Sequence, residues 1–257
     1  MVCLGAKRMR GAAIAAATGW LCLVVWLPLA RAGESGPVID VGGFSSAQVG
    51  QALPEGWKPL TFKKVARHTV YEVVETGAHR VVKATSEASA SGLIKEVTID
   101  PKEYPILRWR WKVDNLLKRS DVRRKDGDDY PARLYITFAY DPDKIGLGRK
   151  LKFKAGRALF GDIPIAALNY IWETKAPVGT IVENAFTDFA MMVVVESGAQ
   201  KVGMWVDEER NIYDDYQIAF GEEPPTINGV AIMSDTDNTK EHATAYYGDI
   251  RFVRRTK

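Results

Sequence analysis

Residues 106–114 alternate between apolar and polar side chains, as the two faces of a β-strand do. The apolar face consists of Leu107, Trp109, Trp111 and Val113. The polar face consists of Arg108, Arg110, Lys112 and Asp114. We expect the apolar face, including both tryptophans, to pack on a core, and the cationic face to remain outside.

Residues 133–140 repeat this layout. One face consists of Leu134, Ile136, Phe138 and Tyr140, and the other of Arg133, Tyr135 and Thr137. We expect the two strands to lie side by side in one sheet, whose outer face is then basic, polar and aromatic. Such a face would suit ligand binding.

Other short β-branched runs follow one another closely, with turn signals such as Pro-Glu-Gly at 54–56 between them. They cover residues 38–41, 58–62, 69–75, 80–85, 92–99, 169–173, 190–196, 230–234 and 244–253. Closely spaced strands of this kind are typical of a sandwich or barrel.

Two segments change to helical spacing. Around Lys150–Arg157, apolar residues recur every three to four positions among many cations. This helix either packs across one end of the sandwich or offers a basic surface to anionic lipid or an acidic polymer. The second helix carries Trp205, Ile212, Tyr216 and Phe220 on one side and stops at Gly221. The predicted fold is mainly β: a jelly-roll-like antiparallel β-sandwich with two helical inserts, formed by residues 33–257 as a single domain.

Residues 1–32 read as an export signal, with a basic start, an uncharged run from Gly11 to Ala30 and a small-x-small pattern ending at Ala32. The alternative is an uncleaved membrane anchor, because the run approaches the length of a bilayer-spanning helix. Either way we expect an exported protein, periplasmic or secreted.

Removing the leader changes the charge and the cysteine count. The full chain has a net charge of +3, and the leader holds four cations and no acids, which leaves −1. A near-neutral domain gives no support to nucleic-acid binding. Cys3 and Cys22 both lie in the leader, so the remaining domain has no disulfide, thiol nucleophile or thiolate ligand.

The sequence lacks the common catalytic motifs. It contains no Gly-x-Ser-x-Gly elbow, Walker loop or complete dinucleotide-binding glycine motif. Its three histidines, His68, His79 and His242, are isolated from one another in sequence. A zinc site or a histidine-assisted nucleophile is therefore disfavoured.

Two acidic loops precede strands. They contain the oxygen-bearing residues Asp126, Asp128 and Asp129, and Asp235, Asp237 and Asn238. Clustered carboxylates on short loops can bind calcium, although neither loop has the EF-hand spacing. The same residues are also ordinary turn formers. Calcium is thus the one cofactor to consider.

A basic and aromatic set supplies the candidate ligand-binding residues. Aromatic rings can stack on sugar rings while arginines and aspartates hold hydroxyl or acid groups. The candidates are Arg110, Arg133, Tyr135 and Trp172, with Asp235 and Asp237 at the rim. The competing interpretation of aromatic residues is core packing, and the pattern leaves open which face carries Tyr170 and Trp172. On the binding interpretation, Arg133→Ala would abolish binding and preserve the fold.

Catalysis by a carboxylate pair is an alternative, since glycoside hydrolysis needs two carboxylates about 5–10 Å apart. The candidate catalytic residues are Glu173, Glu196 and Asp249, in or beside predicted strands. Their more ordinary role would be to pair with the arginines.

Seven segments together resemble one bacterial family, the exported domain of unknown function DUF3047. They are 53–57 (Leu-Pro-Glu-Gly-Trp), 107–112 (Leu-Arg-Trp-Arg-Trp-Lys), 127–133, 169–172, 209–216, 229–239 and 245–250 (Ala-Tyr-Tyr-Gly-Asp-Ile). The resemblance runs from about Phe44 to Phe252 and implies no activity or catalytic residue. The closing strand is also similar to that of jelly-roll carbohydrate-binding modules.

Our leading hypothesis is a non-catalytic module that binds a saccharide or another anionic, hydroxylated ligand of the cell envelope. One alternative is a metal-independent glycan hydrolase or lyase. A second is a structural or assembly partner in the envelope that acts through the basic helix.

Overall fold

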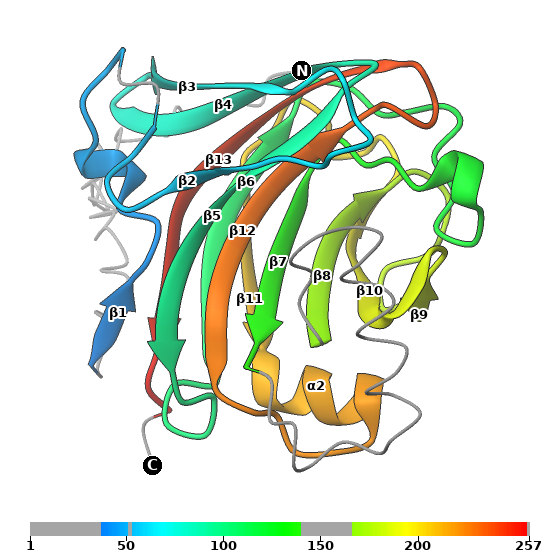
Figure 1. Ribbon diagram of the computed structural model, residues 1–257. Helices are drawn as coiled ribbons and strands as arrows, with labels where there is room; N and C mark the ends of the chain where they lie inside the picture. The colour runs from blue at the N-terminus through cyan, green and yellow to red at the C-terminus, as the bar shows by residue number, and fades with distance from the viewer. Residues whose placement is uncertain (1–36, 51–52, 140–165, 256–257) are drawn as a thin grey trace, which may run out of the picture. The chain divides into compact units, whose positions relative to one another are not determined.

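The computed structural model describes residues 37–50, 53–139 and 166–255 (Figure 1). They belong to the larger of two compact units, Glu34–Lys257. The leader predicted at 1–32 and the basic helix predicted around Lys150–Arg157 lie outside the described residues. Within the described ranges, no helix is both long enough and apolar enough to span a bilayer.

Two β-sheets form the domain. The first sheet contains, in spatial order, β11 (Val206–Asn211), β6 (Ile106–Val113), β13 (His242–Val253), β4 (His79–Glu87) and β3 (Val70–Thr76), with β1 (Val38–Asp40) paired to the end of β13. The second contains β2 (Lys58–Leu60), β5 (Ala90–Ile99), β12 (Ile227–Asp235), β7 (Arg133–Phe138), β8 (Ala166–Glu173), β10 (Thr187–Ser197) and β9 (Ile181–Asn184). Short 3-10 turns occur at Phe44–Ser46 and Lys125–Gly127. The predicted jelly-roll-like β-sandwich is confirmed (Figure 1).

One strand pair departs from the antiparallel pattern. β10 runs parallel to β8, whereas the other pairings in the described sheets are antiparallel. Parallel neighbours need a connection of a dozen or more residues. Residues 174–186 provide it, and they include β9, which the sequence pattern did not predict.

The expectation that the strands at 106–114 and 134–140 lie side by side is wrong. β6 pairs with β11 and β13 in the first sheet, whereas β7 pairs with β12 and β8 in the second. Their amphipathic patterns are alike because both strands face the same core, from opposite sides. Pattern alone specifies the buried face of a strand but not its neighbour.

Aromatic side chains fill the space between the sheets. Trp109 and Trp111 on β6 are 3% and 0% exposed, as predicted. The Trp109 ring centroid lies 5.3 Å from that of Tyr170, and the Trp111 centroid lies 6.1 Å from that of Trp172. Both partners come from β8 on the opposite sheet. The phase of β8 therefore places Tyr170 and Trp172 inside.

The described helix, α2 (Ile212–Phe220), lies beyond the ends of the strands, near β7, β8 and β11 (Figure 1). The Asn211 side chain caps it by accepting hydrogen bonds from Tyr213 N and Asp214 N. It stops at Gly221, which has a left-handed φ of 73°. The predicted helix began too early, because Val206–Asn211 forms strand β11 and Trp205 precedes it.

Candidate functional site

The outer face of the first sheet carries the cations of β6. Burial alternates strictly along this strand, so Arg108, Arg110 and Lys112 lie outside and are partly exposed. Lys112 stands directly opposite Tyr246 on β13, and Arg110 stands opposite Asp207 on β11. Three neighbouring strands thus contribute to one surface.

Trp205 covers part of this surface. The guanidinium carbon of Arg110 lies 4.6 Å from the centre of the Trp205 ring, and Lys112 Nζ lies 4.1 Å from the centre of the Tyr246 ring. The two rings are 6.3 Å apart between centroids, with planes inclined at 62°. We call Arg110, Lys112, Trp205 and Tyr246 the outer aromatic face.

A glycine permits this arrangement. A Cβ atom at position 248 would lie 2.4 Å from Arg110 Cγ, which no real contact allows. The stem of Arg110 therefore lies flat against the backbone of β13 at Gly248. This position brings the guanidinium under the Trp205 ring instead of extending it into solvent.

Carboxylates border the outer aromatic face. Arg110 Nε is 3.8 Å from Asp207 Oδ1, and Lys112 Nζ is 3.0 Å from Asp114 Oδ1. Tyr246 donates its hydroxyl hydrogen to Asp114 Oδ2 at 3.1 Å. Rings, cations and carboxylates held together at a partly exposed surface can stack on a sugar and hydrogen bond to its hydroxyl groups.

Arg133 lies in a different environment from the one predicted. It is 2% exposed, and its guanidinium bonds Asp235 through Nε at 2.8 Å and through a terminal nitrogen at 2.6 Å. The same terminal nitrogen donates to the carbonyl of Asp128 at 2.6 Å. Burial alone would lower the pKa of Arg133, but the nearby carboxylates, Asp235 above all, outweigh it and raise that pKa. Arg133 is a buried ion-pair partner and not part of an open face.

Two other predicted binding residues also lie away from the outer aromatic face. Trp172 is fully buried, and its indole N–H donates to the carbonyl of Gly198 at 3.3 Å. Tyr135 lies on β7, where its hydroxyl accepts a hydrogen bond from Arg133 at 2.8 Å. Burial raises the pKa of Tyr135 to about 12. Of the four aromatic and basic residues predicted to bind a ligand, Arg110, Arg133, Tyr135 and Trp172, only Arg110 belongs to the outer aromatic face.

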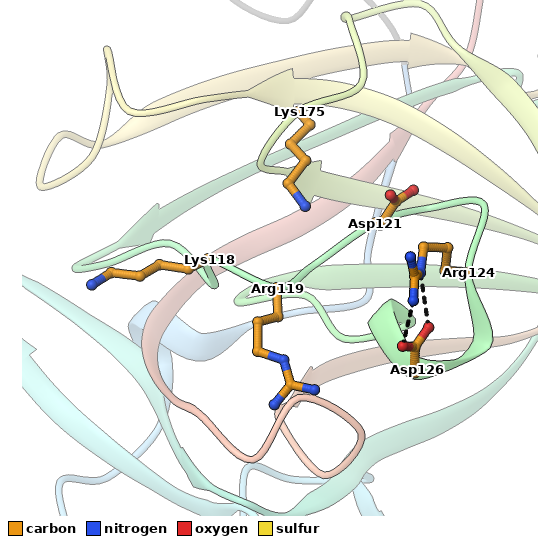
Figure 2. A pocket seen from close by; sticks show the side chains of 6 residues that line it. All are labelled: Lys118, Arg119, Asp121, Arg124, Asp126 and Lys175. Atoms are coloured by element: carbon orange, nitrogen blue, oxygen red, sulfur yellow. Dashed lines mark hydrogen bonds and ion pairs between the residues drawn. The ribbon is translucent and has the colours of Figure 1, made fainter.

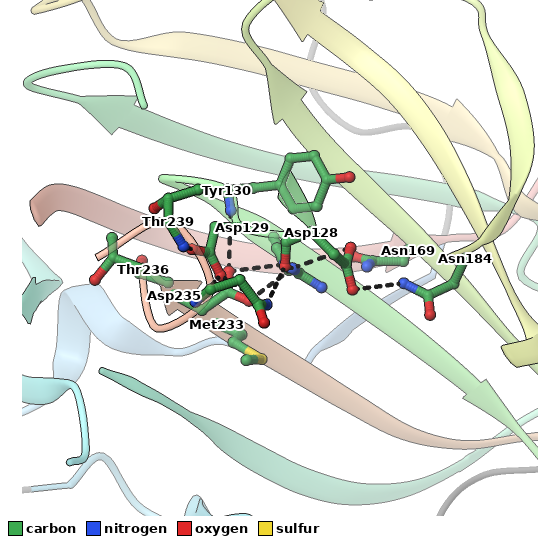
Figure 3. A network of polar contacts seen from close by, with 12 residues as sticks. Asp128, Asp129, Tyr130, Asn169, Asn184, Met233, Asp235, Thr236 and Thr239 are labelled. Carbon is green, nitrogen blue, oxygen red and sulfur yellow. Dashed lines mark hydrogen bonds and ion pairs between the residues drawn. The ribbon is translucent and has the colours of Figure 1, made fainter. Parts of the chain in front are cut away.

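The two acidic loops, 109 residues apart, meet in space (Figure 3). Arg133 bonds to both, through the carbonyl of Asp128 and the carboxylate of Asp235. Asp129 is fully buried and accepts hydrogen bonds from the backbone nitrogens of Asn238 and Thr239. Asp235 accepts one from the backbone nitrogen of Tyr130 at 3.0 Å. We call Asp128, Asp129, Arg133, Asp235, Asp237 and Asn238 the Arg133 cluster. It fastens the start of β7 to the end of β12.

Three of these carboxylates could hold a cation. Oxygen atoms of Asp129, Asp235 and Asp237 lie within 4.8 Å of one another. Burial raises the pKa of Asp237, and the Asp129 charge adds to the rise. Asp126 is not part of this group, because its carboxylate pairs with Arg124 at 2.7 Å on the surface. Calcium binding here stays a prediction.

Each predicted catalytic carboxylate has a local role. Glu173 is fully buried, and its Oε2 accepts the backbone N–H groups of Lys175 and Ala176. Glu196 pairs with Lys201 at 2.5 Å. Asp249 accepts hydrogen bonds from Ser45 and pairs with Arg251 at 3.2 Å.

Sequence reasoning missed two residues of interest. Trp205 was assigned to a helix, although the unbroken polar run at 207–211 argued against a buried helical side there. Glu208, on β11, accepts a hydrogen bond from the indole nitrogen of Trp111 at 3.2 Å. Burial raises the pKa of Glu208 to about 7, with a contribution from the Glu196 charge. No sequence signal marks such an acid.

Residues 55–251 match the family described as "Protein of unknown function (DUF3047)". The chain belongs to this family. The match covers most of both sheets, including the outer aromatic face and the Arg133 cluster. A search of the curated proteins finds no match.

Several solved structures are similar to this DUF3047 chain. The family 11 carbohydrate-binding module of a Clostridium thermocellum cellulosomal cellulase has 7% identity, a TM-score of 0.41, and coverage of 87% of this chain and 98% of that one. A family 30 carbohydrate-binding module from the same organism has 12% identity, a TM-score of 0.37, and coverage of 85% and 99%. The CBM22-1 xylan-binding domain from Paenibacillus barcinonensis Xyn10C has 12% identity, a TM-score of 0.35, and coverage of 88% and 100%. At these TM-scores the similarity decides neither topology nor ligand.

Proposed function

We propose that this DUF3047 protein is a non-catalytic binding module, and that the outer aromatic face binds a saccharide or another hydroxylated ligand of the cell envelope. The observation that carries the proposal is the row formed by Trp205, Arg110 and Tyr246, with Arg110 4.6 Å from the Trp205 ring centre. A large aromatic ring that stays partly exposed above a polar strand does not serve the core. It is available for stacking.

The electrostatics of the face favour a ligand rich in hydroxyl groups. Its cations are each close to a carboxylate, as with Lys112 and Asp114 at 3.0 Å. Alternating donors and acceptors of this kind match sugar hydroxyls, which both donate and accept. An acidic sugar could displace the long Arg110–Asp207 contact of 3.8 Å and take its place.

We also propose that the protein acts outside the cytoplasm, in the periplasm or after secretion. The support is the leader pattern at residues 1–32, which has a basic start and a small-x-small end. The absence of cysteine beyond the leader suits such a compartment, because no free thiol is then exposed to oxidation.

The test is a panel of neutral and acidic polysaccharides, applied to the purified chain in affinity electrophoresis and titration calorimetry. Trp205→Ala should weaken binding about tenfold or more, because it removes the large ring on which the sugar would stack. The matched control is Phe186→Ala, which removes another exposed ring, 50% exposed, away from this face. Equal binding by the two variants would refute the outer aromatic face as the binding site.

A further inference from the structure

A second polar site lies in the loop that follows β6. A pocket of about 300 Å³ is lined by Lys118, Arg119, Asp121, Arg124, Asp126 and Lys175 (Figure 2). Five of these residues come from one loop, and Lys175 comes from the segment after β8. The volume is at the lower end of the range for small-molecule sites.

The pocket is cationic. Its four basic and two acidic lining residues give a formal charge of +2. Arg124 and Asp126 neutralise each other through two hydrogen bonds, of 3.0 and 2.7 Å (Figure 2). In the described part of the chain, Lys118 and Lys175 form no ion pair. Arg119 donates one hydrogen bond, at 3.0 Å, to the uncharged carbonyl of Thr239.

The backbone under these cations is held in place. Asp121 N donates to Gly127 O at 2.9 Å, and Gly127 N donates to Arg124 O at 3.1 Å, which closes the loop. A Cβ atom at position 127 would lie 2.9 Å from both Arg119 O and Asp121 N. Only glycine permits this approach, so the loop forms a compact ring beneath Arg119 and Asp121.

Lys175 is anchored from the other side. The buried carboxylate of Glu173 accepts its backbone N–H, and the neighbouring Thr174 hydroxyl donates to Leu117 O at 2.9 Å. Leu117 is itself fully buried. The two segments that supply the cations are thus fastened to each other. The Glu173 carboxylate, a candidate catalytic residue by sequence, fixes one wall of the pocket.

One further acid lies close by. The Glu241 carboxylate accepts the backbone N–H groups of Lys118 and Arg119, both at 2.9 Å. Both of its oxygens are therefore engaged with the backbone. With Glu241 counted, the region still carries one uncompensated positive charge.

We propose that this pocket binds a phosphomonoester. A phosphate monoester carries a charge of about −1.5 to −2 near pH 7. It would attract the three cations Lys118, Arg119 and Lys175, which outnumber the nearby carboxylates of Asp121 and Glu241. Arg119 can offer two parallel N–H groups to its oxygens, while the two lysines act as point charges. The pocket exceeds the size of a phosphate group, so it can also hold a small attached group such as a sugar.

This site does not depend on the outer aromatic face, which lies on β6, β11 and β13. Trp205→Ala should leave phosphate binding unchanged. A negative result for saccharide binding at the outer aromatic face therefore leaves phosphate binding at the pocket open, and the reverse also holds.

The experiment is titration calorimetry of the purified full-length chain with inorganic phosphate and with a hexose 6-phosphate, and glucose as the uncharged control. Vesicles of phosphatidylcholine with and without phosphatidic acid distinguish a lipid headgroup from a soluble phosphate. Lys175→Gln should weaken binding about tenfold or more, because it removes one charge-assisted contact to the phosphate. Arg119→Gln should do the same.

The matched control is Lys58→Gln, which removes an equal charge from an exposed surface pair with Glu96. It should leave the affinity within about twofold. Thermal unfolding of each variant confirms that it is folded. Absence of binding in all phosphate-containing titrations, or an equal loss in Lys58→Gln, would overturn the proposal.

Discussion

Arg110 and Arg133 both lie on the polar side of a strand with an alternating pattern, yet their environments differ completely. Arg110 lies on the outer face of the first sheet, where its side chain is 31% exposed beside a tryptophan ring. Arg133 lies in the second sheet, where its side chain is 3% exposed between two aspartates. The comparison shows that an arginine on the polar side of a strand indicates an anionic or aromatic partner but does not say whether that partner is a ligand or the chain itself.

The difference follows from what covers each strand. On the outer side of β6, the described contacts are with side chains of the neighbouring strands and with Trp205. The outer side of β7 is closed by the loop at 128–130 and by the turn after β12, which meet over it (Figure 3). A carboxylate from each loop then neutralises the arginine. One arginine remains available to a ligand, and the other holds the fold.

The largest expected effect comes from removing the buried arginine. Arg133→Met should reduce the free energy of unfolding by about 3–5 kcal/mol, because Asp128 and Asp235 are left buried without their partner. Urea unfolding measures this loss. Arg110→Met should cost less than about 1 kcal/mol, since its pair is partly exposed. An equal loss of unfolding free energy in the two variants would contradict the assignment of Arg133 to the fold and of Arg110 to an open face.

A calcium titration tests the other half of the Arg133 cluster. With calcium at about 100 times its dissociation constant, the free energy of unfolding should rise by about 2.7 kcal/mol if Asp129, Asp235 and Asp237 bind the ion, because the ion then binds the folded state and not the unfolded one. That gain corresponds to a rise of about 5–10 °C in Tm. Asp237→Asn should abolish the rise and Asp126→Asn should not. A Tm that neither calcium nor chelator changes would show that the cluster binds no calcium and that Arg133 alone balances its carboxylates.

A smaller, pH-dependent effect is expected at Glu208. Its pKa rises from 4.5 to about 7 on folding, mainly because the side chain is buried. Between these values the folded state holds a proton that the unfolded state has lost, so stability falls as pH rises through this window. Glu208→Gln should remove about 2 kcal/mol of this fall, allowing for partial exposure.

Unfolding midpoints of wild type and Glu208→Gln, measured at several pH values between 4.5 and 7, give the comparison. The two curves should diverge as the pH rises, with the variant the more stable at pH 7. Parallel curves would show that Glu208 ionises normally in the folded protein.

The sequence allowed most of the strands, the buried face of β6 and the end of α2 at Gly221 to be predicted, because each depends on local alternation or on one turn residue. The pairing of the strands could not be predicted from the sequence. The sequence pattern of β6 is satisfied by any partner that leaves Trp109 and Trp111 inside. β11 was missed because its polar run, Asp207–Asn211, lacks the β-branched residues of a typical strand.

The site was predicted in part for the same reason. Arg110 was correctly placed on an outer face, since its phase opposes that of Trp109 and Trp111. The meeting of Asp129 with Asp235 depends on a contact between residues more than a hundred positions apart. The sequence of neither loop contains a signal that predicts its contact with the other.

Two-dimensional NMR of the tryptophan indole N–H signals, recorded while the polysaccharide panel is added, tests whether the outer aromatic face binds a saccharide. Trp109, Trp111 and Trp172 are buried, whereas Trp205 is partly exposed on the outer aromatic face. We expect at least one saccharide to shift the Trp205 signal and to leave the three buried signals in place. A panel that leaves Trp205 unmoved, or a ligand that shifts the Trp172 signal instead, would contradict it.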